Sequence, residues 1–319
     1  MRILVVIMAA ITLCAGPVLG SDTESRWWKT RKIQFMWGQW NHARVDKSVD
    51  FWDGTLPREL FRNVARAGGT VFAELRGCRL EHARFAHEFG LKYFATLFAN
   101  SLATQPGGRR WVKQSGEDHW FKCPLDQASY ERWIVEPQME GLKEGVVDGI
   151  HVDWEYYGGR GEAKGICYCD DCFATFLRGR NVDEAVPEKT NRFGWLSERN
   201  LVAAYEANYH QRRFDMFTSI RKTIHAIKPD MLFSSYGTSF SDFTRAVNTP
   251  QTPFIFLDAR HYGNDDRQAW WESYGTRFRQ EGYLYIPGGW ANALFGAQAS
   301  QVSAARWIYE AAINEDGCW

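Results

Sequence analysis

Three side chains that could carry acid–base chemistry, His151, Asp153 and Glu155, alternate with apolar residues within positions 148–157. Successive side chains of a β-strand point to opposite faces, so these three would share one face. A strand that begins apolar and ends in two carboxylates is how a barrel enzyme presents catalytic groups. Burying all three on one face without a purpose would be costly. The pattern therefore favours an active site over a core strand that ends in a solvated acidic turn.

The elements that must position these residues are short apolar runs alternating with stretches of helical pattern. The predicted strands are 32–38, 70–75, 92–98, 149–155, 231–236, 253–258 and 283–286, and an eighth begins at Gly317. The predicted helices are 57–67, 81–89, 129–145, 197–227, 268–281 and 300–313. No glycine-rich phosphate turn follows the first strand, which argues against an open doubly wound sheet. We expect a single (β/α)8 TIM barrel over residues 21–319, with its last strand cut short at Trp319.

In such a barrel, the residues where strands end and loops begin share one rim. The candidate substrate-binding residues there are Trp37, Glu74, Arg76, Asn100, His151, Tyr236, His261, Trp290 and Asn292. Acids, amides and Trp rings together suit a polyhydroxylated ligand. For Glu74 beside Arg76, a salt bridge under the rim is an equal alternative. We interpret His151 as a hydrogen-bonded spacer to Asp153 rather than as a metal ligand.

Glycoside hydrolysis requires a protonated carboxyl group at the leaving oxygen and a second group opposing it. We assign Glu155 as the general acid, because the neighbouring carboxylate of Asp153 disfavours its ionised form. Both side chains leave one strand in the same direction, so Asp153 is awkwardly placed to attack from the opposite face of the sugar. The second group should come from the substrate or from another strand. Asp258, on a strand that we place across the barrel, is the best candidate, and Tyr262 follows it.

The segment that ends at Glu155 resembles the Asp-x-x-Asp-x-Asp-x-Glu signature of glycoside hydrolase family 18, the chitinases and related endo-N-acetylglucosaminidases. The resemblance implies that Glu155 is the general acid and that Asp153 orients a substrate acetamido group, which acts as nucleophile. In that family a Tyr after strand six assists and a Trp on strand eight floors the site; Tyr262 and Trp319 stand roughly there. His151 is a departure, since the family has Asp at this position.

A second resemblance comes from the cysteines Cys123, Cys167, Cys169 and Cys172. One upstream Cys followed by a Cys-x-Cys-x-x-Cys run is similar to the zinc cluster of family 42 β-galactosidases. It implies a structural zinc ion beside the acid/base strand, which would fix the long loop there and take no part in catalysis. Four thiolates give closed tetrahedral coordination, whereas such close cysteines form poorly shaped mutual disulfides. We favour zinc, with disulfides as the alternative in an exported protein and Cys78 as a substitute ligand.

The two resemblances leave the second catalytic group open. The family 42 interpretation also makes Glu155 the acid/base, but it requires a nucleophilic Glu after the seventh strand. Residues 286–290 contain none, so Glu315 or a loop residue would have to substitute. In a third scheme, that of certain α-galactosidase-like barrels, Asp153 is the nucleophile and Asp258 is the acid.

The net charge and the N-terminal segment indicate which partners and which cellular compartment to expect. The 38 Lys and Arg balance the 38 Asp and Glu, so no net charge directs the protein to nucleic acid or an anionic membrane. Arg2, an apolar run over 3–14 and small residues up to Gly20 predict a signal peptide over residues 1–20. The run is too short for a comfortable membrane span. We expect a secreted or periplasmic protein, cleaved near Gly20.

The sequence thus predicts a secreted glycoside hydrolase with a carbohydrate substrate, a zinc site and no organic cofactor; its oligomeric state stays open. A barrel that binds glycans without cleaving them is the alternative from another class. Trp27 and Trp28 precede the barrel, so we interpret them as packing residues. Arg109 and Arg110 are most simply read as solvated surface.

Overall fold

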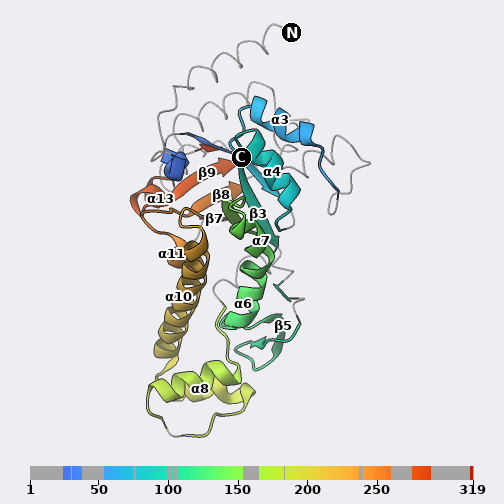
Figure 1. Ribbon diagram of the computed structural model, residues 1–319. Coiled ribbons are helices and arrows are strands. Elements are labelled where there is room, and N and C mark those ends of the chain that lie inside the picture. The colour runs from blue at the N-terminus through green and yellow to red at the C-terminus, as the bar shows by residue number, and fades with distance from the viewer. Residues whose placement is uncertain are drawn as a thin grey trace, which may run out of the picture.

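A computed structural model describes the part of the chain that positions the site. It covers residues 24–29, 31–37, 54–74, 77–98, 102–103, 106–153, 165–182, 184–236, 240–259, 275–288 and 317–318. Within these residues, eight parallel strands follow one another in the order β10-β1-β2-β3-β6-β7-β8-β9. They form a nearly closed barrel surrounded by helices (Figure 1). The predicted (β/α)8 fold is confirmed.

The strands match the apolar runs of the sequence closely. They are β1 (Ile33–Trp37), β2 (Val71–Glu74), β3 (Lys92–Phe98), β6 (Gly149–Asp153), β7 (Leu232–Tyr236), β8 (Ile255–Ala259), β9 (Leu284–Gly288) and the short β10 (Gly317–Cys318). β10 pairs in parallel with β1, where Ile33 is in register with Gly317. The eighth strand therefore takes the place next to β1 that closure of a barrel requires.

Alternate residues of the strands point into the barrel, where they form one apolar cluster. Its strand members are Ile33, Phe35, Val71, Ala73, Phe94, Leu232, Ile255, Leu257 and Ile286. Trp27 and Trp28, from the short helix η1 (Glu24–Lys29), are buried in the same cluster. These two rings pack against the barrel interior, as the sequence indicated.

The outward-facing strand residues pack against helices in a second cluster. The helices that contribute to it include α3 (Arg58–Arg66), α4 (Leu80–Glu88), α6 (Gln127–Ile134), α7 (Met139–Lys143), α10 (Val202–Ile227), α11 (Asp242–Val247) and α13 (Thr276–Gln280). The single helix predicted over 129–145 is broken: α6 ends at Ile134, and η2 (Glu136–Gln138) precedes α7. Pro137 is the cause, because it lacks an N–H and its ring clashes with the preceding turn.

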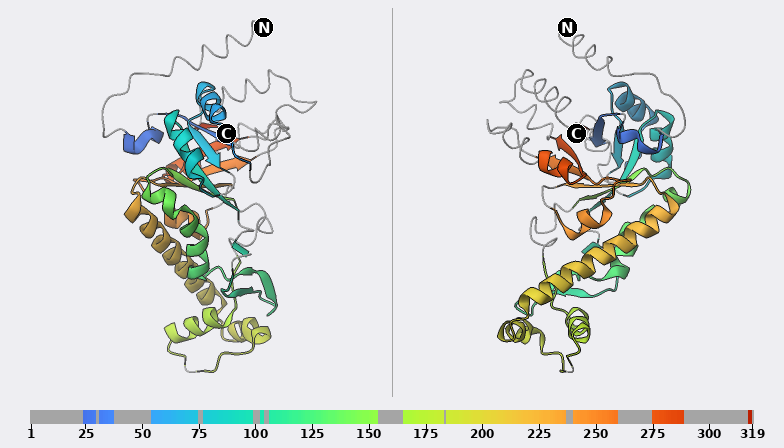
Figure 2. Two further views of the ribbon diagram at one scale, coloured as in Figure 1. Left: turned by 45° about the vertical axis from the view of Figure 1, so that its right-hand side comes forward. Right: turned by 90° about the vertical axis from the view of Figure 1, so that its left-hand side faces the viewer.

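Two insertions leave the barrel where β3 and β6 end. The first contains the antiparallel hairpin of β4 (Arg110–Val112) and β5 (Asp118–Lys122). The second contains α8 (Asp170–Gly179), η3 (Lys189–Asn191) and α9 (Arg192–Glu198), after which α10 returns to β7. Figure 2 shows α10 as a long diagonal helix that joins the sheet to α8 at the far end of the molecule. The insertions share a third core around the four cysteines.

Among the described residues, no helix combines the length and apolar character needed to cross a membrane.

Candidate functional site

The side chains of β6 alternate between its two faces from Gly149 to Asp153, as the sequence predicts. Ile150 and Val152 belong to the outer core. His151 and Asp153 occupy the alternate positions, which face the barrel interior. Gly149 shares that face, and a Cβ atom on it would lie only 2.3 Å from the ring of Phe94. The interior is therefore filled below His151, and the buried carboxyl group of Asp153 closes the strand at its carboxyl end.

His151 is held inside the barrel by residues of neighbouring strands. Its Nδ1 atom lies 2.9 Å from the Oγ atom of Ser234, the residue in register with it on β7. Its ring centroid lies 5.9 Å from that of Phe35 and 4.7 Å from that of Tyr236. Burial lowers the pKa of His151 to about 3. The imidazole is therefore neutral at ordinary pH and is hydrogen-bonded to Ser234, a partner that the sequence did not reveal. Its role as a spacer to Asp153 stays a prediction.

Tyr236 and His151 are thus two predicted substrate-binding residues that the structure brings together, at the end of the barrel where Asp153 lies. Tyr236 is the last residue of β7 and is partly exposed. Its ring meets His151 edge to face, with 77° between the planes. His151 is fully buried, so of the two rings only that of the partly exposed Tyr236 could meet a ligand at this rim.

Glu74 instead lies on the outward face of β2 and is fully buried. Its Oε2 atom accepts a hydrogen bond of 2.6 Å from His82 of α4 and one of 3.3 Å from the hydroxyl of Tyr93. The Nε2 atom of His82 accepts from the backbone N–H of Leu56, so Nδ1 carries the proton that Glu74 receives. The sequence left open a structural pairing of Glu74 with Arg76 as an alternative to sugar binding. The structure shows a structural pairing of Glu74, but with His82 as the partner. Contact with a sugar stays a prediction.

The remaining predicted site residues cannot be placed. Arg76, Asn100, Glu155, His261, Tyr262, Trp290 and Asn292 lie outside the described residues, as do Glu315 and Trp319. Trp37 and Asp258 belong to β1 and β8, but their side chains are outside the described part. The strand order corrects one expectation about Asp258. Only β7 separates β8 from β6, so Asp258 comes from the next strand but one rather than from across the barrel.

Asp148, at the opposite end of β6 from Asp153, is buried in a network of cations. Its Oδ2 atom accepts from His87 Nε2 at 2.6 Å and from the backbone N–H of Tyr93 at 2.9 Å. Lys92 and Lys228 place their Nζ atoms 3.4 and 3.5 Å from Oδ1. Burial would raise the pKa of Asp148, but the His87 hydrogen bond and the two lysines outweigh it and lower that pKa. Asp148 therefore joins the start of β6 to α4, to β3 and to Lys228 at the end of α10. It lies at the end of β6 that is opposite the rim.

The four cysteines predicted as metal ligands come together. Their sulfur atoms all lie within 4.8 Å of one another, and all four residues are buried. Cys123 Sγ lies 3.5 Å from that of Cys172 and 3.7 Å from that of Cys169. A tetrahedral zinc ion with Zn–S bonds of about 2.3 Å separates its sulfurs by about 3.8 Å. The group can therefore hold a metal ion. All five cysteines whose side chains are described, Cys78 included, are free of disulfides.

The surroundings of the four-cysteine group suit thiolates. Backbone N–H groups of Val112 and Cys169 point to Cys167 Sγ, each at 3.4 Å. Hydrogen bonds from the other three thiols lower the pKa of Cys169, whereas the contacts among the thiols raise the pKa of Cys123 and Cys172, so Cys169 loses its proton more readily than these two. Arg109 donates to Leu125 O at 2.6 Å and pairs with Asp171. Arg109 thus lies at the surface with 35% of its side chain exposed, but its guanidinium is paired beside the cysteines rather than freely solvated.

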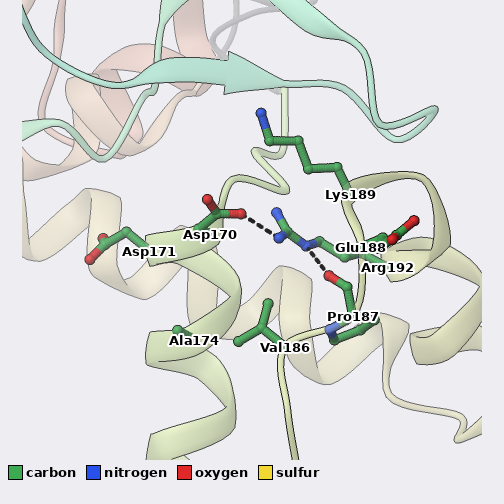
Figure 3. A pocket seen from close by; sticks show the side chains of 8 residues that line it. All are labelled: Asp170, Asp171, Ala174, Val186, Pro187, Glu188, Lys189 and Arg192. Carbon is green, nitrogen blue, oxygen red and sulfur yellow. Dashed lines mark hydrogen bonds and ion pairs between the residues drawn. The ribbon is translucent and has the colours of Figure 1, made fainter.

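A cavity of about 580 Å³ lies in the insertion after β6 rather than at the barrel rim. Asp170, Asp171, Val186, Lys189 and Arg192 are among its lining residues (Figure 3). Arg192 spans it, pairing with Asp170 and donating to Pro187 O at 3.0 Å. The guanidinium thus joins α8 to the segment before η3. This contact is structural, and no predicted catalytic residue lines the cavity.

A nearly closed parallel barrel with acidic and aromatic residues at its rim is an architecture used by many enzymes. No protein-family model matches the chain, and no curated protein matches it. Solved structures similar to it include several glycoside hydrolases. A β-galactosidase from Bacillus circulans sp. alkalophilus has a TM-score of 0.53 and 12% identity, with 90% of this chain aligned to 50% of that one. This chain thus spans about half of that enzyme.

Two further similar structures are more distant. The catalytic domain of a β-amylase from Paenibacillus polymyxa gives a TM-score of 0.46 at 8% identity, covering 82% of this chain and 87% of that one. An endo-β-N-acetylglucosaminidase from Cordyceps militaris gives a TM-score of 0.43 at 10% identity, covering 95% of this chain and 86% of that one. At such identities the likeness concerns the fold alone.

Proposed function

We propose that the protein is a secreted or periplasmic glycoside hydrolase that cleaves O-glycosidic bonds in an oligo- or polysaccharide. Glu155 is its general acid, and Asp153 is the electrostatic partner of Glu155. The observation that carries the proposal is the position of Asp153, a buried carboxyl group on the inward face of β6 at its carboxyl end. Catalytic groups of parallel barrels occupy this end. The role of Glu155 rests on the sequence, since this residue lies outside the described part.

The chemistry follows from the neighbourhood of Asp153. A carboxylate in a buried setting disfavours ionisation of a second carboxyl group nearby, so Glu155 keeps its proton until the leaving oxygen takes it. Asp153 would orient a polar substituent of the sugar, and His151, fixed by Ser234, would support it from below. Asp258 or Tyr262 would complete the site. Substrate-assisted cleavage, and a scheme with Asp153 as nucleophile, differ in which group meets the anomeric carbon.

We also propose that the four-cysteine group binds a structural zinc ion. The sulfur separations of 3.5 and 3.7 Å fit the edges of a zinc tetrathiolate. Cys123 comes from the insertion after β3 and the other three cysteines from the insertion after β6, so the ion would hold the two insertions together. Four protein ligands leave no open position, so its role is structural. A signal peptide over residues 1–20 would direct export and be cleaved near Gly20.

The experiment that tests the function compares wild type with Glu155→Gln and Glu198→Gln on a panel of aryl glycosides and polysaccharides. Glu198 is the matched control, because its side chain is 77% exposed on α9. Release of reducing ends by Glu155→Gln should fall by about 10²- to 10⁴-fold, the usual contribution of a general acid. Glu198→Gln should equal wild type.

The same panel separates the enzyme from a barrel that only binds glycans. If wild type and Glu155→Gln were equally inert on every substrate yet bound a glycan alike, the binding protein would be the correct interpretation. Activity lost to the same extent in the Glu198→Gln control would point to a general effect of removing charge.

A further inference from the structure

The β4–β5 hairpin exposes a large aromatic ring. Trp120 of β5 is 51% exposed. The other exposed large hydrophobic residues of the described part, Val186, Phe214 and Ile227, belong to other elements. Burial of an indole ring stabilises the folded protein. Folding alone therefore does not explain a half-exposed Trp at a fixed place in a hairpin.

Trp120 stands at the end of a row of rings. The centroids of Trp111 and His119 are 4.5 Å apart, and those of His119 and Trp120 are 5.6 Å apart. On the other side, Phe121 is buried and meets Trp120 edge to face at 5.2 Å. The exposed ring of Trp120 is therefore held from one side by the buried Phe121 and from the other by His119, whose ring is tilted by 35° against it.

Several contacts fix the backbone under this row. Arg110 donates to the carbonyl oxygen of Trp120. At the hairpin turn, Gly116 has a φ of +88°, and a Cβ atom there would lie 2.7 Å from the backbone of Thr190. Asp118 pairs with Lys189 of η3 at 3.0 Å. A ring held in this way loses little freedom when it binds a ligand, which is the advantage of a preorganised contact.

The row also lies beside the chain that returns from the rim. The indole N–H of Trp111 donates to Ile166 O at 3.0 Å, and its ring fills the space next to Gly165. Partial burial and the nearby Lys113 lower the pKa of His119, so this ring is neutral at pH 7 and still polar. The hairpin itself lies outside the barrel, beside α6 (Figure 1).

We propose that the exposed ring of Trp120 is a platform that binds a pyranose ring of a polysaccharide chain, at a subsite distinct from the catalytic centre. The proposal rests on the proposed function for the class of its ligand. The axial C–H face of one sugar ring has about the area of one indole, whereas a protein partner would need a contiguous apolar patch of several hundred Å². The charged groups recorded in this part of the hairpin are Arg110, which donates to Trp120 O, and Asp118, which pairs with Lys189.

The test measures binding to polysaccharides in the Glu155→Gln background, where hydrolysis does not interfere. Affinity electrophoresis and pull-down use chitin, β-galactan, xylan and β-glucan. Affinity for the preferred polymer should fall about tenfold in Trp120→Ala and be largely recovered in Trp120→Tyr, which keeps a stacking ring. Phe214→Ala is the control, as Phe214 is 36% exposed on α10; its affinity should equal that of the parent.

Separately, the catalytic efficiency of otherwise wild-type Trp120→Ala on a small aryl glycoside should be unchanged. Equal polymer binding by Trp120→Ala and Phe214→Ala would overturn the platform, even if hydrolysis is observed. So would failure of the parent to bind any of the polymers, or an effect of Trp120→Ala on self-association alone. If no substrate is hydrolysed but Trp120→Ala still weakens binding, the platform stands and the hydrolase proposal falls.

Discussion

At the scale of single residues, two aspartates at opposite ends of β6 have different environments. Asp148 contacts His87, Lys92 and Lys228, whereas Asp153 ends the strand at the rim. The sequence motif joins both in one signature. The partners of Asp148 come from distant segments, so only the folded structure assigns this carboxylate to stability.

We expect Asp148→Asn to lower the free energy of unfolding by about 2 kcal/mol, because the buried carboxylate accepts from the backbone N–H of Tyr93 and pairs with the partly buried Lys92 and Lys228. Asp230→Asn is the matched control. Asp230 contacts the same Lys228 at 3.9 Å but is 36% exposed, so its loss should cost less than about 1 kcal/mol. Urea unfolding at neutral pH measures both. Equal losses in the two variants would contradict the assigned role of Asp148.

His151 gives a prediction for pH. Its pKa is about 3 in the folded protein and about 6.5 in the unfolded chain. Between these values the unfolded chain binds a proton that the folded protein does not, so stability falls as the pH falls through this window, by about 1.4 kcal/mol per unit.

Unfolding of wild type and His151→Gln between pH 4 and 6 tests this prediction. The variant should show a slope smaller by about 1.4 kcal/mol per unit. A His151→Gln profile parallel to that of wild type would mean that this imidazole is not buried as described.

At the scale of elements, the two insertions depend on one another through the four-cysteine group. Cys123 precedes α6, and Cys167, Cys169 and Cys172 lie at the start of α8. The shared core includes Val112 and Leu125 on one side and Phe173, Phe176 and Tyr205 on the other. A metal ion there would join segments that are far apart in the sequence, and would leave the barrel strands independent of it.

Protein purified without reductant should contain about one zinc ion per chain, and Cys169→Ser should lose it. Hydrogen exchange should then accelerate in residues 110–125 and 165–180, while β7 and β8 stay protected. Cys78→Ser, outside the group, should keep the metal. Substoichiometric zinc in wild type, or disulfides among the four cysteines on thiol counting, would contradict the zinc site.

The elements also separate what the sequence can and cannot predict. Each barrel strand shows as an apolar run because burial on both faces is a local property. The break between α6 and α7 at Pro137 likewise depends on a single residue. The predicted helix over 197–227 begins only at Val202, because Asn200 adopts a φ of +53° after α9. The β4–β5 hairpin and α8 have no long apolar face, and their core forms only when both insertions meet.

At the scale of the whole molecule, the barrel places β3, β6 and β7 side by side, so that their carboxyl ends and the insertions of β3 and β6 belong to one end of the fold. The order of strands and helices predicts this arrangement. It does not predict that Glu74 faces outward to His82, because the direction of that side chain depends on strand register and boundaries, where a shift of one residue exchanges the faces. The predicted order already places the strand of Asp258 two strands from β6, so the expectation that Asp258 lies across the barrel did not follow from it.

Proton donation by Glu155 is the central claim, and the dependence of rate on the leaving group tests it most directly. Catalytic efficiency of Glu155→Gln is measured on a series of aryl glycosides of rising leaving-group pKa, beside wild type. A leaving group that needs no proton should be released by the variant almost as fast as by wild type. The deficit should grow to about 10²- to 10⁴-fold for the most basic ones. The same deficit across the whole series would show that Glu155 does not donate the proton.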